Sequence, residues 1–538
     1  MKHEAKTVSE ETTNKYTVAN SLTNYYLAIM FSFFPLFLSE AYAHARMDKY
    51  WFYLIATTVL VVSVGLCMLL SRSEAKRSGK QSKLILPLSV TDIFMLCYLA
   101  MAVFSTLLSD YKEESFLGTG GRNNGLLLLL MYLLMYFVIT RNYVQKDYVL
   151  IIYLVTSSLI ALLTVLNFFY IDPLGMLDGY DEATVVDFGS TLGNKNIIAA
   201  FMCIFLPVAV MLFVVGKAKA TRIVAGVAII FAYAGVLCAD STSDILGMMV
   251  ILPVMAIFCA KSFDYLKRYL LALTILFLSG KLLQLFATII GGHDKGFEFI
   301  QEFLIFHPAM FAPIILCGLG YLLMALIGKK GEPRYPAKAI QITLTVLFSC
   351  GIIAVLGLFI NFSFINTQTD IGSFEKLLRF DDYWGTHRGF MWRVGFEEFA
   401  KFNPLRILFG TGPDTAYYVF EPHFAELLER FGDATTDCAH NEYINYLLTQ
   451  GALGLLTYLG VMISAIVRAV RTAKRDPYAM VFIAPVICYL AQSTVNLYNP
   501  IVTPTMFIFL SLAEAMSRQR KELEVRSEEL GVRSFGKA

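Results

Sequence analysis

A histidine stands where a polar stretch gives way to a long apolar segment. Residues 437–443 read DCAHNEY and run directly into the apolar residues that follow. If a helix begins there, one stripe of it carries His440, Tyr443, Leu447, Gly451 and Gly454, because helical neighbours recur every three or four residues. His440 would then lie where the helix meets water, and its neutral imidazole could accept a proton from a hydroxyl group. The alternative is a histidine that only caps the helix or lies at the membrane surface.

Two arginines upstream have the chemistry to bind phosphate. Arg388 and Arg393 lie in WGTHRGFMWR at 384–393, and a guanidinium group can hold two phosphate oxygens at once. The alternative for each is an ion pair with a neighbouring acidic residue, namely Asp381, Asp382, Glu397 or Glu398. Further along, Gly410 and Gly412 predict a tight turn whose backbone N–H groups could face an anion.

A third polar cluster precedes another apolar segment. The sequence FGSTLGNKN at 188–196 contains Asn194, Lys195 and Asn196, which are candidates for substrate binding. Capping of the following helix explains the two asparagines about as well. Lys281 lies inside an apolar segment, where a charge marks either a functional site or a side chain that reaches the membrane surface.

Other kinds of chemistry lack their motifs in this sequence. It contains no GxxxxGK[ST] loop, no GxGxxG fingerprint, no HExxH and no CxxC pair. We therefore predict no metal site, no nucleotide and no cofactor.

The composition shows what must position these residues. Of 538 residues, 57% are hydrophobic and only 16% are charged, with a net charge of +2 and a mean hydropathy of +0.60. Soluble proteins carry about 25% charged residues, so this chain cannot cover a water-exposed surface. A nucleic-acid-binding protein is excluded by the small net charge. The fold class predicted is an all-α integral membrane protein.

The apolar residues gather in about fourteen blocks, each long enough to cross a hydrocarbon layer of roughly 30 Å as a helix. The predicted spans lie near 22–41, 50–71, 86–108, 124–140, 147–169, 196–215, 221–239, 244–260, 269–290, 309–328, 339–360, 450–467, 479–497 and 501–517.

Lys and Arg residues concentrate in alternate loops and in both tails, whereas the other short loops hold only Arg46, Lys49, Lys112, Arg122, Lys195 and Lys295. Cytoplasmic loops accumulate Lys and Arg, so both termini are expected inside. The predicted organisation is therefore a cytoplasmic N-tail (1–20), eleven spans (21–360), a large external catalytic loop (361–440), three spans (441–517) and a cytoplasmic C-tail (518–538). A loop of that length tends to be functional.

Three stretches together resemble the O-antigen ligase and polymerase family of bacterial membrane glycosyltransferases. GSTLGNKN at 189–196, followed by Leu206-Pro207, is similar to the family's G-T-x-G-N-x-N … L-P segment. Arg388 with Trp392, then the glycine turn at 410–412, resembles its arginine–tryptophan and glycine segment. His440-Asn441-Glu442-Tyr443 through Gly454 resembles its H-N-x-[YLF]-L … G-x-x-G segment.

The resemblance implies a GT-C-like, metal-independent enzyme in the bacterial cytoplasmic membrane with its active site outside. It would transfer or polymerise a glycan from an undecaprenyl-diphosphate-linked donor with inversion. His440 would be the general base and Arg388 would hold the diphosphate, with Asn441 and Tyr443 at the substrate. The acceptor would be another glycan in a polymerase, or a lipid or other cell-surface molecule in a ligase, and envelope polysaccharide assembly proteins are possible partners.

One position departs from the family. Where many members have an arginine after the G-N-x-N span, this chain has Asp244. The second cation would then be Lys195, Arg122 or Arg393, or else the donor differs from the family's. The competing interpretations are a transporter or flippase of lipid-linked glycans, which would move the lipid without cleaving it, and a structural partner in envelope assembly.

Overall fold

The structure is a computed structural model. It describes residues 18–39, 42, 44–77, 87–118, 122–181, 185, 187–290, 296–329 and 335–529. Most of the predicted N-tail (1–20), part of the predicted C-tail (518–538) and Lys295 lie outside the described residues.

Every predicted span falls on a helix. These helices are α2 (Val18–Leu36), α3 (Ala45–Arg77), α4 (Val90–Leu108), α6 (Leu126–Asn142), α7 (Asp147–Phe168), α9 (Lys195–Val215), α10 (Lys219–Ala239), α11 (Thr242–Cys259), α12 (Phe263–Ile290), α14 (Phe311–Lys329), α15 (Ala337–Ile360), α21 (Glu442–Ala473), α22 (Tyr478–Gln492) and α23 (Thr503–Glu529). Among the described residues, ten helices are long and apolar enough to cross a membrane, and α6 and α22 are shorter apolar helices. An all-α, multi-pass membrane protein is thus confirmed, while the count of fourteen crossings stays a prediction.

Most helices differ from their predicted bounds by a few residues, and α21 and α23 differ most. α21 begins at Glu442, before the predicted start at 450, because the Asn441 side chain caps it by accepting from the N–H groups of Tyr443 and Ile444. α23 continues past the predicted end at 517, into the segment that was expected to be a tail.

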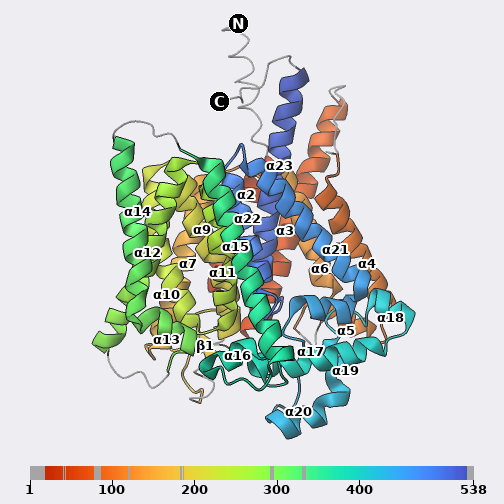
Figure 1. Cartoon of the computed structure of the whole chain (residues 1–538). Coiled ribbons are helices and arrows are strands. Elements are labelled where there is room, and N and C mark those ends of the chain that lie inside the picture. The colour runs from red at the N-terminus through yellow and green to blue at the C-terminus, as the bar shows by residue number, and fades with distance from the viewer. Residues whose placement is uncertain are drawn as a thin grey trace.

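Short helices gather at one end of the bundle, which we call the loop end (Figure 1). They are α5 (Lys112–Leu117), α13 (Phe299–Phe306), α16 (Glu375–Leu378), α17 (Trp384–Ala400), α18 (Pro404–Phe409), α19 (Ala416–Phe420) and α20 (Phe424–Phe431). A small antiparallel pair, β1 (Phe188–Gly189) and β2 (Gly193–Asn194), precedes α9. The C-terminal parts of α3 and α23 extend from the opposite end, the tail end (Figure 1).

Burial separates the centre of the bundle from its flank. In α9, 89% of the residues in the most apolar 18-residue stretch are buried inside the protein. The corresponding shares for α14 and α15 are 6% and 0%. A helix that is apolar on all sides needs either protein or lipid around it. α9 is therefore central, and α14 and α15 present apolar surface suited to lipid.

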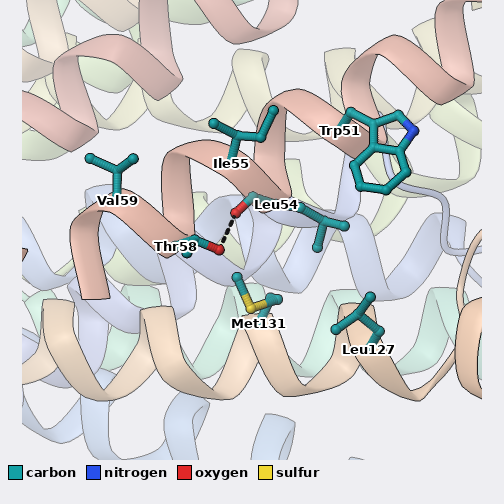
Figure 2. A pocket seen from close by; sticks show the side chains of 7 residues that line it. All are labelled: Trp51, Leu54, Ile55, Thr58, Val59, Leu127 and Met131. Carbon is teal, nitrogen blue, oxygen red and sulfur yellow. Dashed lines mark hydrogen bonds between the residues drawn. The ribbon is translucent and has the colours of Figure 1, made fainter. Parts of the chain in front are cut away.

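An open depression between α3 and α6 also has an apolar lining (Figure 2). We call it the apolar groove. It has a volume of about 340 Å³ and is lined by Trp51, Leu54, Ile55, Thr58, Val59, Leu127 and Met131.

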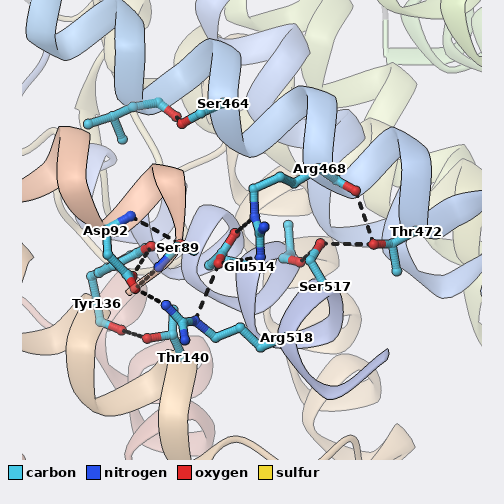
Figure 3. Close-up of polar contacts among 12 residues, drawn as sticks. Ser89, Asp92, Tyr136, Thr140, Ser464, Arg468, Thr472, Glu514, Ser517 and Arg518 are labelled. Carbon is cyan, nitrogen blue, oxygen red and sulfur yellow. Dashed lines mark hydrogen bonds and ion pairs between the residues drawn. The ribbon is translucent and has the colours of Figure 1, made fainter. Parts of the chain in front are cut away.

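Towards the tail end, buried charges join four helices (Figure 3). Asp92 of α4 accepts hydrogen bonds from Tyr136 of α6 and Arg518 of α23, and Arg468 of α21 binds Glu514 of α23 through two hydrogen bonds of 2.8 and 2.9 Å. Asp92 and Glu514 have fully buried side chains. Charges this deep require partners, so the network fixes how these helices pack.

Candidate functional site

The backbone at His440 is held from both sides. Ala439 accepts a hydrogen bond from the Trp392 indole (2.9 Å) and donates its N–H to the Asn445 side chain (3.3 Å). Asn441 on the other side caps α21. His440 itself has a φ of +46°, so it precedes the helix rather than lying on it. The predicted stripe from His440 to Gly454 is therefore wrong at its first position.

His440 lines a polar cavity of about 520 Å³ at the loop end. We call this the polar cavity. Its lining residues come from α3, from the segment before α6, and from the loop between α15 and α21: Arg46, Arg122, Thr386, Met391, Tyr417, Leu427, Asp433, Thr435, Thr436, Asp437 and His440. The structure thus brings together His440 and Arg122, two of the predicted site residues. Arg46 and Asp437 were not predicted as site residues.

Arg122 is anchored by two acidic residues. Its side-chain Nε donates to both oxygens of Asp437 at 3.0 Å, and its backbone N–H donates to Asp414 at 2.8 Å. Asp414 also accepts from the N–H of Asn124 at 2.9 Å. Burial raises the pKa of Asp414 to about 7, although the two N–H groups act in the opposite direction.

Arg388 lies at the start of α17, directly after a backbone kink in which Gly385, Thr386 and His387 all have positive φ values. Its Nη1 donates to the Gly385 carbonyl at 2.6 Å. Its Nε is buried without a hydrogen-bond partner, and no carboxylate of the described residues forms an ion pair with it. Burial lowers the pKa of this guanidinium group. Arg388 is therefore a cation with hydrogen-bonding capacity still to be used.

The electrostatic environment keeps His440 neutral. Burial is the largest effect, followed by the positive charges of Arg122 and Arg388, and together they lower the pKa of His440 to about 3. Asp437 opposes this shift. The imidazole is therefore an acceptor at neutral pH, which a general base must be.

Arg393 follows the ion-pair alternative. Its guanidinium binds Asp382 through two hydrogen bonds of 2.9 and 3.1 Å and Glu397 through one of 2.9 Å. It also lies 3.5 Å from Glu426. The carboxylates of Asp382, Glu397 and Glu426 thus contact the Arg393 guanidinium group, which was predicted to bind phosphate.

The glycine turn contacts α21 instead of presenting free N–H groups. Gly412 donates its N–H to Thr449 at 2.7 Å, and Gly410 donates its N–H to Arg406 at 2.7 Å. The N–H groups that we expected to face an anion therefore have backbone carbonyls as partners. α21 is itself broken at Gly451 (φ +70°, ψ −176°) where it meets this segment.

The remaining predicted residues have structural contacts. Asn194 caps α9 by accepting from the Asn196 N–H, and the Asn196 side chain accepts from Ser241 at 3.0 Å. Lys195 lies 2.9 Å from Asp187. The Tyr443 hydroxyl donates to the carbonyl of Leu490 in α22 at 2.7 Å. None of the four lines the polar cavity.

Asp244, at the position of the family arginine, is fully buried. Neither of its side-chain oxygens has a hydrogen-bond partner among the described residues. Among all the residues that the structure describes, no group of three or more His, Cys, Asp or Glu side chains could hold a metal ion.

Comparison with known families gives one match. Residues 308–459 match the family model described as O-antigen ligase. Because of this similarity we call residues 308–459 the O-antigen ligase domain. It covers less than a third of the chain and runs from just before α14 to the middle of α21. No curated protein matches the chain.

The O-antigen ligase domain includes Arg388, Arg393, Asp414, Asp437 and His440. Arg46 and Arg122 come from outside it, so the polar cavity forms where the domain meets the N-terminal part of the chain. The match confirms the family resemblance and supports an enzyme of the membrane glycosyltransferase type.

Proposed function

We propose that this protein is a membrane glycosyltransferase that transfers or polymerises an undecaprenyl-diphosphate-linked glycan at the outer face of the bacterial cytoplasmic membrane. One observation carries the proposal: a neutral histidine lies in a cavity of the O-antigen ligase domain within the electrostatic influence of two arginines.

The chemistry needs a base and a cation, and these residues provide both. His440 accepts the proton of the acceptor hydroxyl as its oxygen attacks the sugar carbon that bears the diphosphate. The new glycosidic bond forms as the bond to the diphosphate breaks, and the configuration inverts. Arg388 binds the diphosphate and stabilises the charge that develops on it, so that no metal is required. Arg388 itself is not a lining residue of the cavity, but its charge acts on His440 together with that of Arg122. Arg122 is the best placed second cation, because it lines the cavity as well, whereas Lys195 and Arg393 do neither.

The topology follows from the distribution of Lys and Arg. In the proposed arrangement the chain crosses the membrane fourteen times in a GT-C-like fold, with both termini inside and the loop end outside. The acceptor is a second glycan in a polymerase and a lipid or cell-surface molecule in a ligase.

In a transporter, the intramembrane Lys281 could be a residue of the transport pathway. Its Nζ donates to the carbonyls of Ile305 and His307, at 2.7 and 3.2 Å, where α13 ends. A cation at the C-terminal end of a helix is stabilising. These contacts give Lys281 a structural role and remove the main argument for a transport pathway.

The test uses purified protein in vesicles with a lipid-linked glycan donor. We expect free undecaprenyl diphosphate and a lengthened or ligated glycan as products. His440→Ala should lower turnover by roughly 10²–10⁴-fold, the typical contribution of general-base catalysis, with donor binding retained. Arg388→Ala should weaken donor binding as well.

His423 offers a matched control. It lies in the same domain, its Nε2 lies 2.7 Å from Glu398, and it does not line the polar cavity. His423→Ala should therefore turn over at nearly the wild-type rate. Normal product formation by His440→Ala would refute the mechanism. Movement of intact donor across the vesicle membrane would favour the transporter interpretation.

A further inference from the structure

The apolar groove lies on the same two segments of the chain that supply arginines to the polar cavity. Arg46 is in the first turn of α3, and the groove begins on that helix at Trp51. Arg122 precedes α6, and the groove begins on that helix at Leu127. On both segments the first groove residue comes five positions after the arginine. On α3, five residues of helix rise by about 7.5 Å, so the groove starts a short distance along that helix from Arg46. On the other segment α6 begins at Leu126, so Leu127 lies in its first turn, close in the chain to Arg122.

The lining of the apolar groove is suited to a hydrocarbon chain (Figure 2). Trp51, Ile55 and Val59 are 53%, 62% and 60% exposed, so the groove is open and no part of the described chain fills it. Thr58 carries its one hydroxyl group, which donates to the Leu54 carbonyl at 2.7 Å. Apart from the Trp51 indole N–H, the side chains of the lining therefore offer no donor that is still to be used. From Trp51 to Val59 the groove follows α3 for about 12 Å.

We propose that the apolar groove binds the polyprenyl chain of the donor lipid, while the diphosphate of the same lipid binds in the polar cavity at the loop end. This inference rests on the proposed function. A lipid diphosphate has an anionic head joined to a long apolar tail, and it needs cations at the membrane surface directly beside an apolar path into the bilayer. Arg46 and Arg122 provide the cations, in a lining that also contains Asp433 and Asp437, and on both segments the groove begins five residues after the arginine. Trp51 lies at the junction, where aromatic rings favour the membrane interface.

The experiment measures the contribution of the polyprenyl chain to binding separately from that of the diphosphate. Wild-type protein in phospholipid nanodiscs is titrated with undecaprenyl diphosphate and, separately, with inorganic pyrophosphate. Ile55→Trp places a bulky ring in the groove at an exposed position, so the fold should be retained. We expect at least a tenfold loss of affinity for undecaprenyl diphosphate and an unchanged affinity for pyrophosphate.

Ile315→Trp is the matched control, because Ile315 is 55% exposed on the apolar surface of α14 and does not line the groove. It should bind both probes like the wild type. A photoreactive residue at position 55, but not at 315, should crosslink to undecaprenyl diphosphate, and excess phosphatidylglycerol should not compete.

The outcomes are distinct. If Ile55→Trp binds undecaprenyl diphosphate normally, or if phosphatidylglycerol abolishes the crosslink, the groove holds ordinary membrane lipid and the inference is overturned. If instead His440→Ala and Arg388→Ala both keep wild-type turnover, the proposed function fails, whatever the groove binds.

Discussion

Replacing Gly451 by alanine tests how α21 positions His440, the proposed general base. Gly451 has φ +70° and ψ −176°, a conformation that only glycine adopts readily. A Cβ atom at this position would lie 2.4 Å from the backbone of Leu408 in α18. The approach is mutual, because a Cβ atom at Gly410 would lie 2.3 Å from the backbone of Thr449.

The cost of Gly451→Ala has two parts. The unfavourable backbone conformation costs about 1–3 kcal/mol. Overpacking against a backbone that cannot rotate away costs about 1–3 kcal/mol more. The expected loss of stability is therefore roughly 2–6 kcal/mol, unless α21 straightens and moves away from α18. Straightening would displace the helix that begins two residues after His440, so either response should lower turnover.

Thermal unfolding in detergent and glycan transfer in vesicles measure the two effects. Gly65→Ala is the control, because Gly65 lies in α3 with no atom within 4 Å of an added Cβ. That variant should melt and turn over like the wild type. If Gly451→Ala matched it in both assays, the argument from the kink would be refuted.

Three further predictions use single positions. Because the pKa of His440 in the free protein is lowered to about 3, kcat/KM for the donor should change little from pH 8 to pH 5, whereas with an ordinary imidazole as base it would fall about thirtyfold. A pH profile of kcat/KM for the donor decides. Asp92→Ala removes one of the two carboxylates that pair with the buried Arg518, the other being Glu514, and it also removes the partner of Arg141. It should destabilise the protein by up to about 3–5 kcal/mol, measured by thermal unfolding, while Asp92→Ala/Arg518→Leu should regain part of that loss. Lys195→Ala breaks only the half-exposed ion pair with Asp187, so a donor titration should give an affinity within about twofold of the wild type.

The helices could be predicted because their signal is local. A block of apolar residues between polar breaks is readable from the sequence alone, and each predicted span coincides with a helix. The break in α21 was missed because its cause is not local. The positive φ at Gly451 accompanies contact with Leu408, more than forty residues earlier, and a helical stripe drawn through Gly451 cannot include that contact.

Residues of the candidate site could be predicted where they belong to a sequence motif. His440 and Arg388 were found from their types, order and neighbours, whereas Arg46 was seen only as a charge in a short loop. Its place beside His440 depends on how α3 packs against distant parts of the chain. Asp437 stands three residues before His440 in the sequence. A carboxylate so close to a candidate base was the signal that could have marked Asp437 as a residue of the site. For Arg393 the sequence left phosphate binding and ion pairing open, and the side-chain positions favour the ion pairs.

The same arginines that are proposed to bind the donor also control the base. In the free protein, Arg122 and Arg388 lower the pKa of His440, which keeps the imidazole neutral but makes it a weak base. A diphosphate bound between them would offset their positive charge, and the pKa of His440 would then rise towards its ordinary value. The histidine would therefore become an effective base only when the donor is in place. An acceptor hydroxyl that arrives first would meet a poor base and no leaving group, so the electrostatics favour transfer over unproductive proton exchange.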